Sequence, residues 1–94
     1  TKDEIKDVNN LNMTLDVNGE RMQTGNTNTM IFNFDIIVSY VSKFMSLQAG
    51  DIITTGTPPG VGMGKKPQVF LKAGDQMKLS IENLGEQSSK VVPV

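Results

Sequence analysis

The chain has 94 residues, a length that allows one domain with a small core. It carries 9 basic and 10 acidic side chains, for a formal net charge of −1, and it has neither histidine nor cysteine. The composition excludes disulfides and a zinc site of the usual ligands, and the balanced charge argues against nucleic-acid binding, which normally needs a basic surface. No apolar run approaches the roughly 18 residues of a membrane-spanning helix and no charged and apolar leader opens the chain, so we expect a cytoplasmic protein that does not contact membranes.

A polar lead-in, Thr1–Asn10, precedes an expected β-hairpin. Apolar residues alternate with polar ones from Leu11 to Val17, which is the period of a half-buried strand. Asn18-Gly19 is a strong signal for a two-residue turn because both positions tolerate positive φ. The chain should therefore return as a second strand over Glu20–Thr24 and continue as a polar loop over Gly25–Thr29.

The next element is an expected amphipathic helix over Phe34–Met45. Its apolar residues recur at helical spacing, and its polar residues lie largely off that face. Asn33 is suited to cap the N-terminus, and Asp35 suits the positive end of the helix dipole. We expect the helix to stop near Ser46 and to pack its apolar face on a sheet.

The second half of the chain carries three further strand signals. Ile52–Thr55 is β-branched, Met77–Ile81 alternates in polarity, and Lys90–Val94 closes the sequence. A loop rich in glycine and proline, Gly56–Pro67, follows the first of them. About five strands and one main helix, in the order strands, helix, strands, indicate an α+β fold with a mixed β-sheet.

A five-residue pattern, L-x-A-G-D, occurs twice, at Leu47–Asp51 and at Leu71–Asp75. Two copies are too few for a solenoid repeat. We expect shared turn chemistry instead, in which the glycine takes a positive φ and the aspartate bonds back to the local backbone.

The chain is organised around Leu47–Gly64, which contains a candidate ligand-binding loop, G-T-P-P-G-V-G. Prolines stiffen this loop, and Thr57 lies after an expected strand, where a hydroxyl and an N–H can be presented to a ligand. A rigid connector without a ligand explains the same composition. A phosphate-binding loop would need Gly at Pro59 and Ser or Thr at Lys66, and a dinucleotide fingerprint would need Gly at Lys65, so nucleotide binding is excluded.

The motif T-G-T-P-P-G-V-G after G-D-I-I, followed by L-K-A-G-D, resembles the fumarylacetoacetate hydrolase family. The resemblance extends upstream to V-N-G-E-R-M-Q at Val17–Gln23, to Asn26-Thr27 and to M-I-F at Met30–Phe32. It covers nearly the whole chain and matches the C-terminal part of the family's catalytic domain. It implies that residues 1–94 are the C-terminal portion of a single catalytic domain, with the mixed β-sheet or β-roll of that family.

The resemblance further implies an enzyme that uses Mg²⁺ or Mn²⁺ to act on 2-oxo or β-diketo acids, as acylpyruvate hydrolases, oxaloacetate decarboxylases and related isomerases do. The metal ligands of the family, a Glu-x-Glu pair and a later Asp, and its assisting lysine lie N-terminal to the matched part. No catalytic and no metal-binding residue is therefore assigned within this chain. Thr57 matches the threonine that holds a substrate carboxylate or carbonyl oxygen in the family, and Gly56 allows close approach. The family also implies a homodimer.

The residues leave one alternative open, a small β-rich module that binds or assembles without catalysis. No complete catalytic set occurs in the sequence, and we expect no site at the acidic cluster of the lead-in (Asp3, Glu4 and Asp7). The chain opens without a methionine, as a fragment would, and removal of an initiator methionine would look the same. Few residues are available for a core, and apolar segments such as Val69–Leu71 favour self-association.

Overall fold

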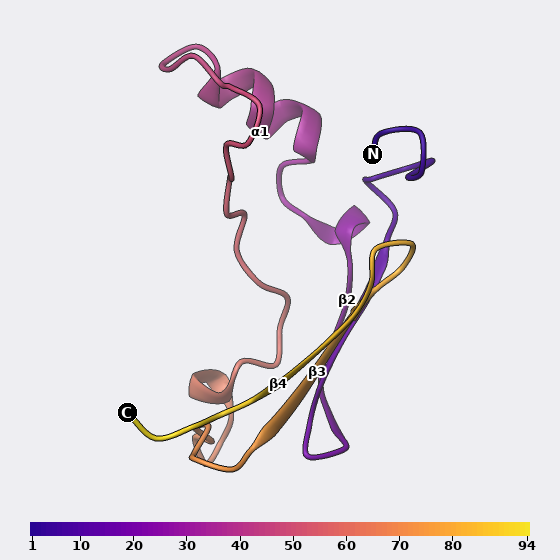
Figure 1. The fold of residues 1–94 in the computed structure, drawn as a ribbon. Helices are drawn as coiled ribbons and strands as arrows, with labels where there is room; N and C mark the ends of the chain where they lie inside the picture. The colour runs from indigo at the N-terminus through magenta and orange to yellow at the C-terminus, as the bar shows by residue number, and fades with distance from the viewer.

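The computed structural model describes residues 1–94 as one antiparallel sheet, one α-helix and two short 3-10 helices (Figure 1). The sheet has four strands in the order β2-β1-β3-β4. The α+β class expected from the sequence is confirmed, and every strand pair within the chain is antiparallel, so the expected mixed sheet has no parallel pair here. The elements are β1 Asn12–Val17, β2 Glu20–Asn26, η1 Thr27–Thr29, α1 Phe34–Val41, η2 Gly62–Gly64, β3 Gln76–Ile81 and β4 Gly85–Lys90.

The hairpin of β1 and β2 forms where the alternating pattern and the Asn-Gly turn predicted it. Asn18 and Gly19 adopt φ of 52° and 81°, and the flanking Val17 and Glu20 are paired. The register shifts between Leu15 and Asp16, because Leu15 pairs with Gln23 whereas Asp16 pairs with Arg21. Met22 is thus the extra residue of a β-bulge on β2, which the sequence pattern did not reveal.

A second hairpin joins β3 to β4, and this corrects the expected strand over Lys90–Val94. β4 ends at Lys90 and consists of polar, exposed residues, G-E-Q-S-S-K. It carries no alternation of polarity because it is an edge strand whose faces both meet solvent. Its pairing with β3 rests on backbone hydrogen bonds and on one exposed ion pair of 3.0 Å between Lys78 and Glu86. The apolar end of the chain lies beyond it.

Helix α1 begins as expected and ends earlier. The Asn33 side chain caps it by accepting a hydrogen bond of 2.9 Å from the N–H of Ile36, and Asp35 lies in the first turn. Regular helix stops at Val41, where the Ser42 hydroxyl donates to the Ser39 carbonyl at 2.9 Å and competes with the helical backbone bonds.

The predicted packing of α1 on the sheet is wrong for this chain. No residue of α1 is buried, and Figure 1 shows the helix at the far end of the molecule from the turn between β1 and β2. Phe34, Ile37 and Val41 of its apolar stripe are only half-buried, and none of them packs on the sheet as a core residue. None of the helices has the length and hydropathy that crossing a bilayer requires.

The expected strand over Ile52–Thr55 is also absent. This segment belongs to the long irregular run that returns from α1 to the sheet in Figure 1. No backbone group of residues 52–59 takes part in a backbone hydrogen bond within the chain. The β-branched residues favour an extended chain, but a strand also needs a neighbour to pair with, and none of the described residues supplies one.

The two L-x-A-G-D segments form the same turn, which confirms the interpretation of the repeat. Gly50 and Gly74 have φ of 97° and 96°. The Asp51 carboxylate accepts from the N–H of Gln48 at 2.8 Å, and the Asp75 carboxylate accepts from the N–H of Lys72 at 2.9 Å. The second turn leads directly into β3.

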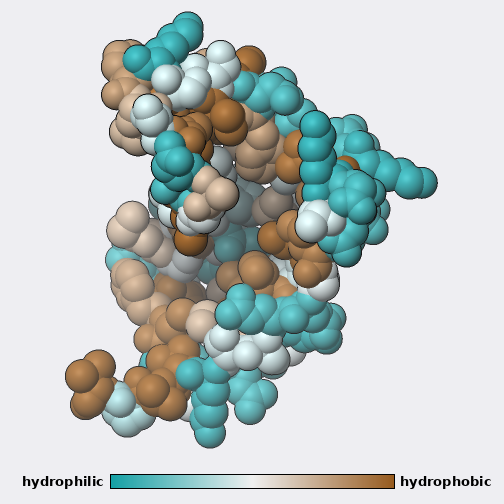
Figure 2. Space-filling model, turned by 45° about the horizontal axis from the view of Figure 1, so that its top comes forward, coloured by the Kyte–Doolittle hydropathy of each residue, from teal (hydrophilic) through white to brown (hydrophobic).

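The chain has very little core of its own. Only Leu11, Thr27 and Asp75 are buried. The accessible surface is 7696 Å² for 10.2 kDa, whereas a compact monomer of this mass exposes about 5300 Å². Figure 2 accordingly shows apolar side chains reaching the surface in several places around a hollow in this face.

Candidate functional site

The loop that carries Thr57 is seated against strand β2. A side chain at Gly60 would place its Cβ 2.2 Å from the carbonyl oxygen of Met22, and one at Gly25 would stand 2.8 Å from the Cβ of Pro58. Only glycine allows these two approaches, because neither the backbone at Met22 nor the rigid ring of Pro58 can yield. The loop is therefore held close along β2 by its shape.

The side chain of Gln23 fastens the loop at its centre. Its Nε2 donates to the carbonyl oxygen of Pro58 at 2.6 Å and to the hydroxyl oxygen of Thr57 at 3.0 Å. The orientation of the amide follows from chemistry, since a carbonyl oxygen only accepts and must face the NH₂ end. No protein group accepts the hydroxyl proton of Thr57 in the structure.

The bulge on β2 explains why Gln23 can reach the loop. Successive side chains of a regular strand point to opposite faces. Met22 and Gln23 nevertheless line the same cavity of about 210 Å³, together with Val61 of the loop and Phe70 of the segment that follows the loop. The extra residue at the bulge turns both side chains toward the segment that crosses this face.

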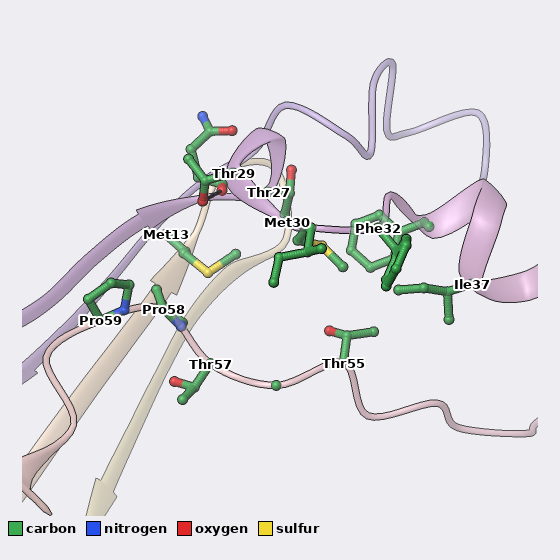
Figure 3. A pocket seen from close by; sticks show the side chains of 14 residues that line it. Met13, Thr27, Thr29, Met30, Phe32, Ile37, Thr55, Thr57, Pro58 and Pro59 are labelled. Carbon is green, nitrogen blue, oxygen red and sulfur yellow. Dashed lines mark hydrogen bonds between the residues drawn. The ribbon is translucent and has the colours of Figure 1, made fainter. Parts of the chain in front are cut away.

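A larger cavity of about 500 Å³ opens on the other side of the loop, between the loop, the end of β2 and the start of α1 (Figure 3). Both residues singled out from the sequence, Gly56 and Thr57, belong to its lining. Hydroxyl and amide groups and apolar side chains make up the wall, and none of its residues is charged. The lining residues are Met13, Asn26, Thr27, Thr29, Met30, Ile31, Phe32, Phe34, Ile37, Thr55, Gly56, Thr57, Pro58 and Pro59.

The two threonines beside Gly56 face different ways. In Figure 3 the Thr55 side chain points toward Phe32 and Ile37, whereas the Thr57 side chain leaves the loop on the opposite side. Gly56 produces this reversal because its φ of 105° lies in a region that side-chain-bearing residues avoid. The Thr57 hydroxyl is consequently an exposed group on the Gln23 side of the loop.

The acidic residues do not converge. No group of three or more histidine, cysteine, aspartate or glutamate side chains comes together in a way that could hold a metal ion. In the lead-in, Asp3 and Glu4 accept from the Thr1 hydroxyl, and Asp7 accepts from the N–H of Asn9 at 3.0 Å. The bond from the Thr1 hydroxyl lowers the pKa of Asp3.

Reasoning from the sequence missed Gln23 and the apolar wall. Gln23 had one visible signal, since V-N-G-E-R-M-Q was among the segments that carry the family resemblance. Its role depends on the bulge and on a contact with a loop 34 residues away, which no local pattern reports. The wall residues Met30 and Phe32 belong to the M-I-F segment of that resemblance.

Comparisons with known proteins agree with this fold. A sequence model described as fumarylacetoacetate (FAA) hydrolase C-terminal matches residues 1–92. The chain is 60% identical over 92 residues to 2,4-didehydro-3-deoxy-L-rhamnonate hydrolase of Sphingomonas sp. (strain SKA58), a match that covers 97% of this chain and 32% of the relative.

Two solved structures are similar along almost the whole chain. The fumarylacetoacetate hydrolase of psychrophilic Exiguobacterium antarcticum has a TM-score of 0.95 and 41% identity, covering 100% of this chain and 34% of that protein. The maleylpyruvate hydrolase of Sphingobium sp. SYK-6, in complex with manganese(II) ion and pyruvate, has a TM-score of 0.87 and 36% identity. This match covers 98% of this chain and 32% of that protein. The chain thus spans about a third of the length of these relatives.

Proposed function

The chain belongs to the fumarylacetoacetate hydrolase family, and from this membership we propose that it forms the C-terminal portion of a single catalytic domain. The domain belongs to a metal-dependent enzyme that acts on 2-oxo or β-diketo acids. Hydrolysis of a C–C bond is the favoured reaction, because the relatives described above are hydrolases. Decarboxylation and keto–enol isomerisation of the same class of acids are the alternatives.

In this proposal Thr57 and Gly56 bind the oxygen atoms at one end of the substrate. The observation that carries it is the state of the Thr57 hydroxyl, which is exposed, fixed by Gln23 and free to donate its proton. A carboxylate or a carbonyl oxygen is the acceptor that such a group fits. The open backbone at Gly56, where an added side chain would meet nothing within 4 Å, lets the substrate approach closely.

The metal ion is assigned to residues outside this chain. Its carboxylates form no ligand set, and the cavity wall carries no charged side chain. A hard divalent cation needs several converging oxygen ligands, so the groups present here do not fit one. Residues 1–94 accordingly bind and orient the substrate, and they supply no acid, base or metal ligand to the reaction.

The chain exposes more surface than a compact domain, which also supports the proposal that it is one portion of a larger catalytic domain. A radius of gyration of 15.7 Å compares with about 12 Å for a compact domain of this length. Ile36, Val38 and Tyr40 of α1 and the segment Val69–Leu71 are exposed. We propose that the remainder of the domain covers part of this surface and that the enzyme is a homodimer.

The test uses the complete enzyme, meaning residues 1–94 joined to the N-terminal two thirds of the domain. Purified protein is assayed with Mg²⁺ or Mn²⁺ against a panel of acids, including acetylpyruvate, maleylpyruvate and oxaloacetate, and against their methyl esters. The proposal expects turnover of at least one acid and at least tenfold lower kcat/KM for its ester, which lacks the charge that Thr57 binds. Equal turnover of acid and ester, or no turnover of any acid, contradicts it.

A further inference from the structure

We propose that Gln23 is a positioning residue that sets the Thr57 hydroxyl as a hydrogen-bond donor to the acidic end of the substrate. The inference rests on the proposed function, because it gives a task to the same hydroxyl. It adds a residue from β2 to a site that the sequence placed in the loop alone.

The direction of the hydrogen bonds carries the argument. The Gln23 amide has two protons at Nε2, and the Pro58 carbonyl at 2.6 Å takes one of them. The other is directed at the Thr57 oxygen at 3.0 Å. An isolated threonine hydroxyl rotates and can accept or donate. With Gln23 as its donor, the Thr57 hydroxyl is left to donate, and a carboxylate, ketone or enolate oxygen is the partner it selects.

Gln23 also links the position of the loop backbone to the orientation of the Thr57 hydroxyl. The same nitrogen holds the backbone at Pro58 and the side chain at Thr57, so one group fixes the position and the polarity of the contact. The bulge at Met22 aims Gln23 at the loop, and the contact of Gly60 with the Met22 carbonyl keeps the loop at that distance. Without the bulge, counting from the Val17–Glu20 pair would place Gln23 opposite Thr14, and its side chain would face the other side of the sheet.

The test is a double-mutant cycle in the complete enzyme. The variants are Gln23→Met, which keeps length without donors, Thr57→Val, which keeps shape without the hydroxyl, and the combination of both. The readouts are the Kd of pyruvate with Mn²⁺ present, measured by calorimetry, and kcat for the acid that is turned over fastest. Gln87→Met on β4 and Thr24→Val on β2 are the matched controls, because each makes the same change outside the loop contact.

We expect Gln23→Met to weaken pyruvate binding about tenfold when Thr57 is present and less than about twofold when residue 57 is Val, because its effect passes through the hydroxyl. The effect falls on binding, with kcat reduced much less. Gln23→Glu, which keeps the shape of the side chain and reverses the polarity of the contact, serves if the Met variant does not fold. It should weaken pyruvate binding more than tenfold, because its carboxylate accepts the Thr57 proton itself and repels the anion.

Two results overturn the proposal, and they differ. If Gln23→Met weakens pyruvate binding by the same factor with Thr and with Val at residue 57, Gln23 only supports the Pro58 backbone. The proposed role of Thr57 then stands. Unchanged pyruvate binding in Thr57→Val, or no binding of pyruvate to the unmodified enzyme, would remove the role of Thr57 and that of Gln23 with it.

Discussion

The side chain of Asn18 donates a hydrogen bond of 2.9 Å to the carboxylate of Asp75, which ties the turn of the first hairpin to the residue that precedes β3. The same side chain also accepts, through its Oδ1, a hydrogen bond of 2.9 Å from the N–H of Gln76. Asp75 is one of three buried residues in the chain and also accepts from the N–H of Lys72. This small network joins the turn of the first hairpin to the start of β3, which lies far away in the sequence.

Asp75 should stabilise the fold through its ionised form. The bonds from Asn18 and from the Lys72 backbone lower its pKa below the ordinary 3.8. A lowered pKa in the folded state adds stability above the unfolded value, and this stability disappears as pH falls through the folded pKa. We expect Asp75→Asn to lower the free energy of unfolding at pH 7, with the gap closing below about pH 4.

The measurement is urea unfolding of the complete enzyme at several pH values. Asp51→Asn is the control, because Asp51 makes the same bond to its own turn and has no partner like Asn18. A gap that stays constant from pH 7 down to about pH 2 would show that the charge of Asp75 is not what matters.

The contact between Gly60 and Met22 gives a second prediction. Gly60→Ala places a Cβ against the Met22 carbonyl oxygen and forces alanine into a φ of 110°. Strain at such a φ alone costs about 1–2 kcal/mol. Gly50→Ala is the matched control, since Gly50 has a φ of 97° and open space around it.

We expect the Gly60 variant to lose at least twice as much free energy of unfolding as the Gly50 variant and to weaken pyruvate binding, because the loop must move off β2. Equal losses in thermal or urea unfolding would mean that the loop is free to shift, and would remove the basis for its fixed geometry.

Local signals predicted the parts of this fold that neighbouring residues determine. Asn18-Gly19 fixes the first hairpin, Asn33 starts α1, and the two L-x-A-G-D turns bond to their own backbone. The end of α1 depended on a competing bond from Ser42, which hydrophobic spacing does not report.

Features that depend on distant partners could not be predicted. Ile52–Thr55 has the composition of a strand and pairs with nothing here, whereas the polar strand β4 pairs through its backbone and one exposed ion pair, Lys78 with Glu86. At the site, loop composition singled out Thr57, and its role in binding stays a prediction. The role of Gln23 required the bulge at Met22, which only the register of the two strands reveals.

The isolated chain should not bind Mg²⁺ tightly. Its acidic residues form no group that could hold a metal ion, and the wall of the larger cavity is uncharged. Calorimetric titration of Mg²⁺ into residues 1–94 should therefore give no binding at micromolar concentration, whereas the complete enzyme should bind the ion. Micromolar affinity of the isolated chain for Mg²⁺ would place metal ligands within these residues. It would contradict the proposal that the metal ligands lie outside them.

The isolated chain should also self-associate. Ile52 and Phe70 are 88% and 64% exposed, and the chain shows about 2400 Å² more surface than a compact monomer of its mass. Sedimentation of residues 1–94 should report species heavier than 10.2 kDa, and the complete enzyme should sediment as a dimer. A stable monomer of the isolated chain at high concentration would show that the exposed apolar surface needs no partner.

The most direct test of the account concerns the Thr57 hydroxyl itself. Pyruvate affinity and KM are compared among the unmodified complete enzyme, Thr57→Ala, Thr57→Ser and the control Thr24→Ala. Removing a hydrogen bond to a charged group costs about 1.5–3 kcal/mol, so Thr57→Ala should weaken binding of the acid about tenfold to a hundredfold. Thr57→Ser, which keeps the hydroxyl that Gln23 holds, should remain close to the unmodified enzyme. Unchanged affinity and KM in Thr57→Ala would contradict the account and leave the loop as a rigid connector.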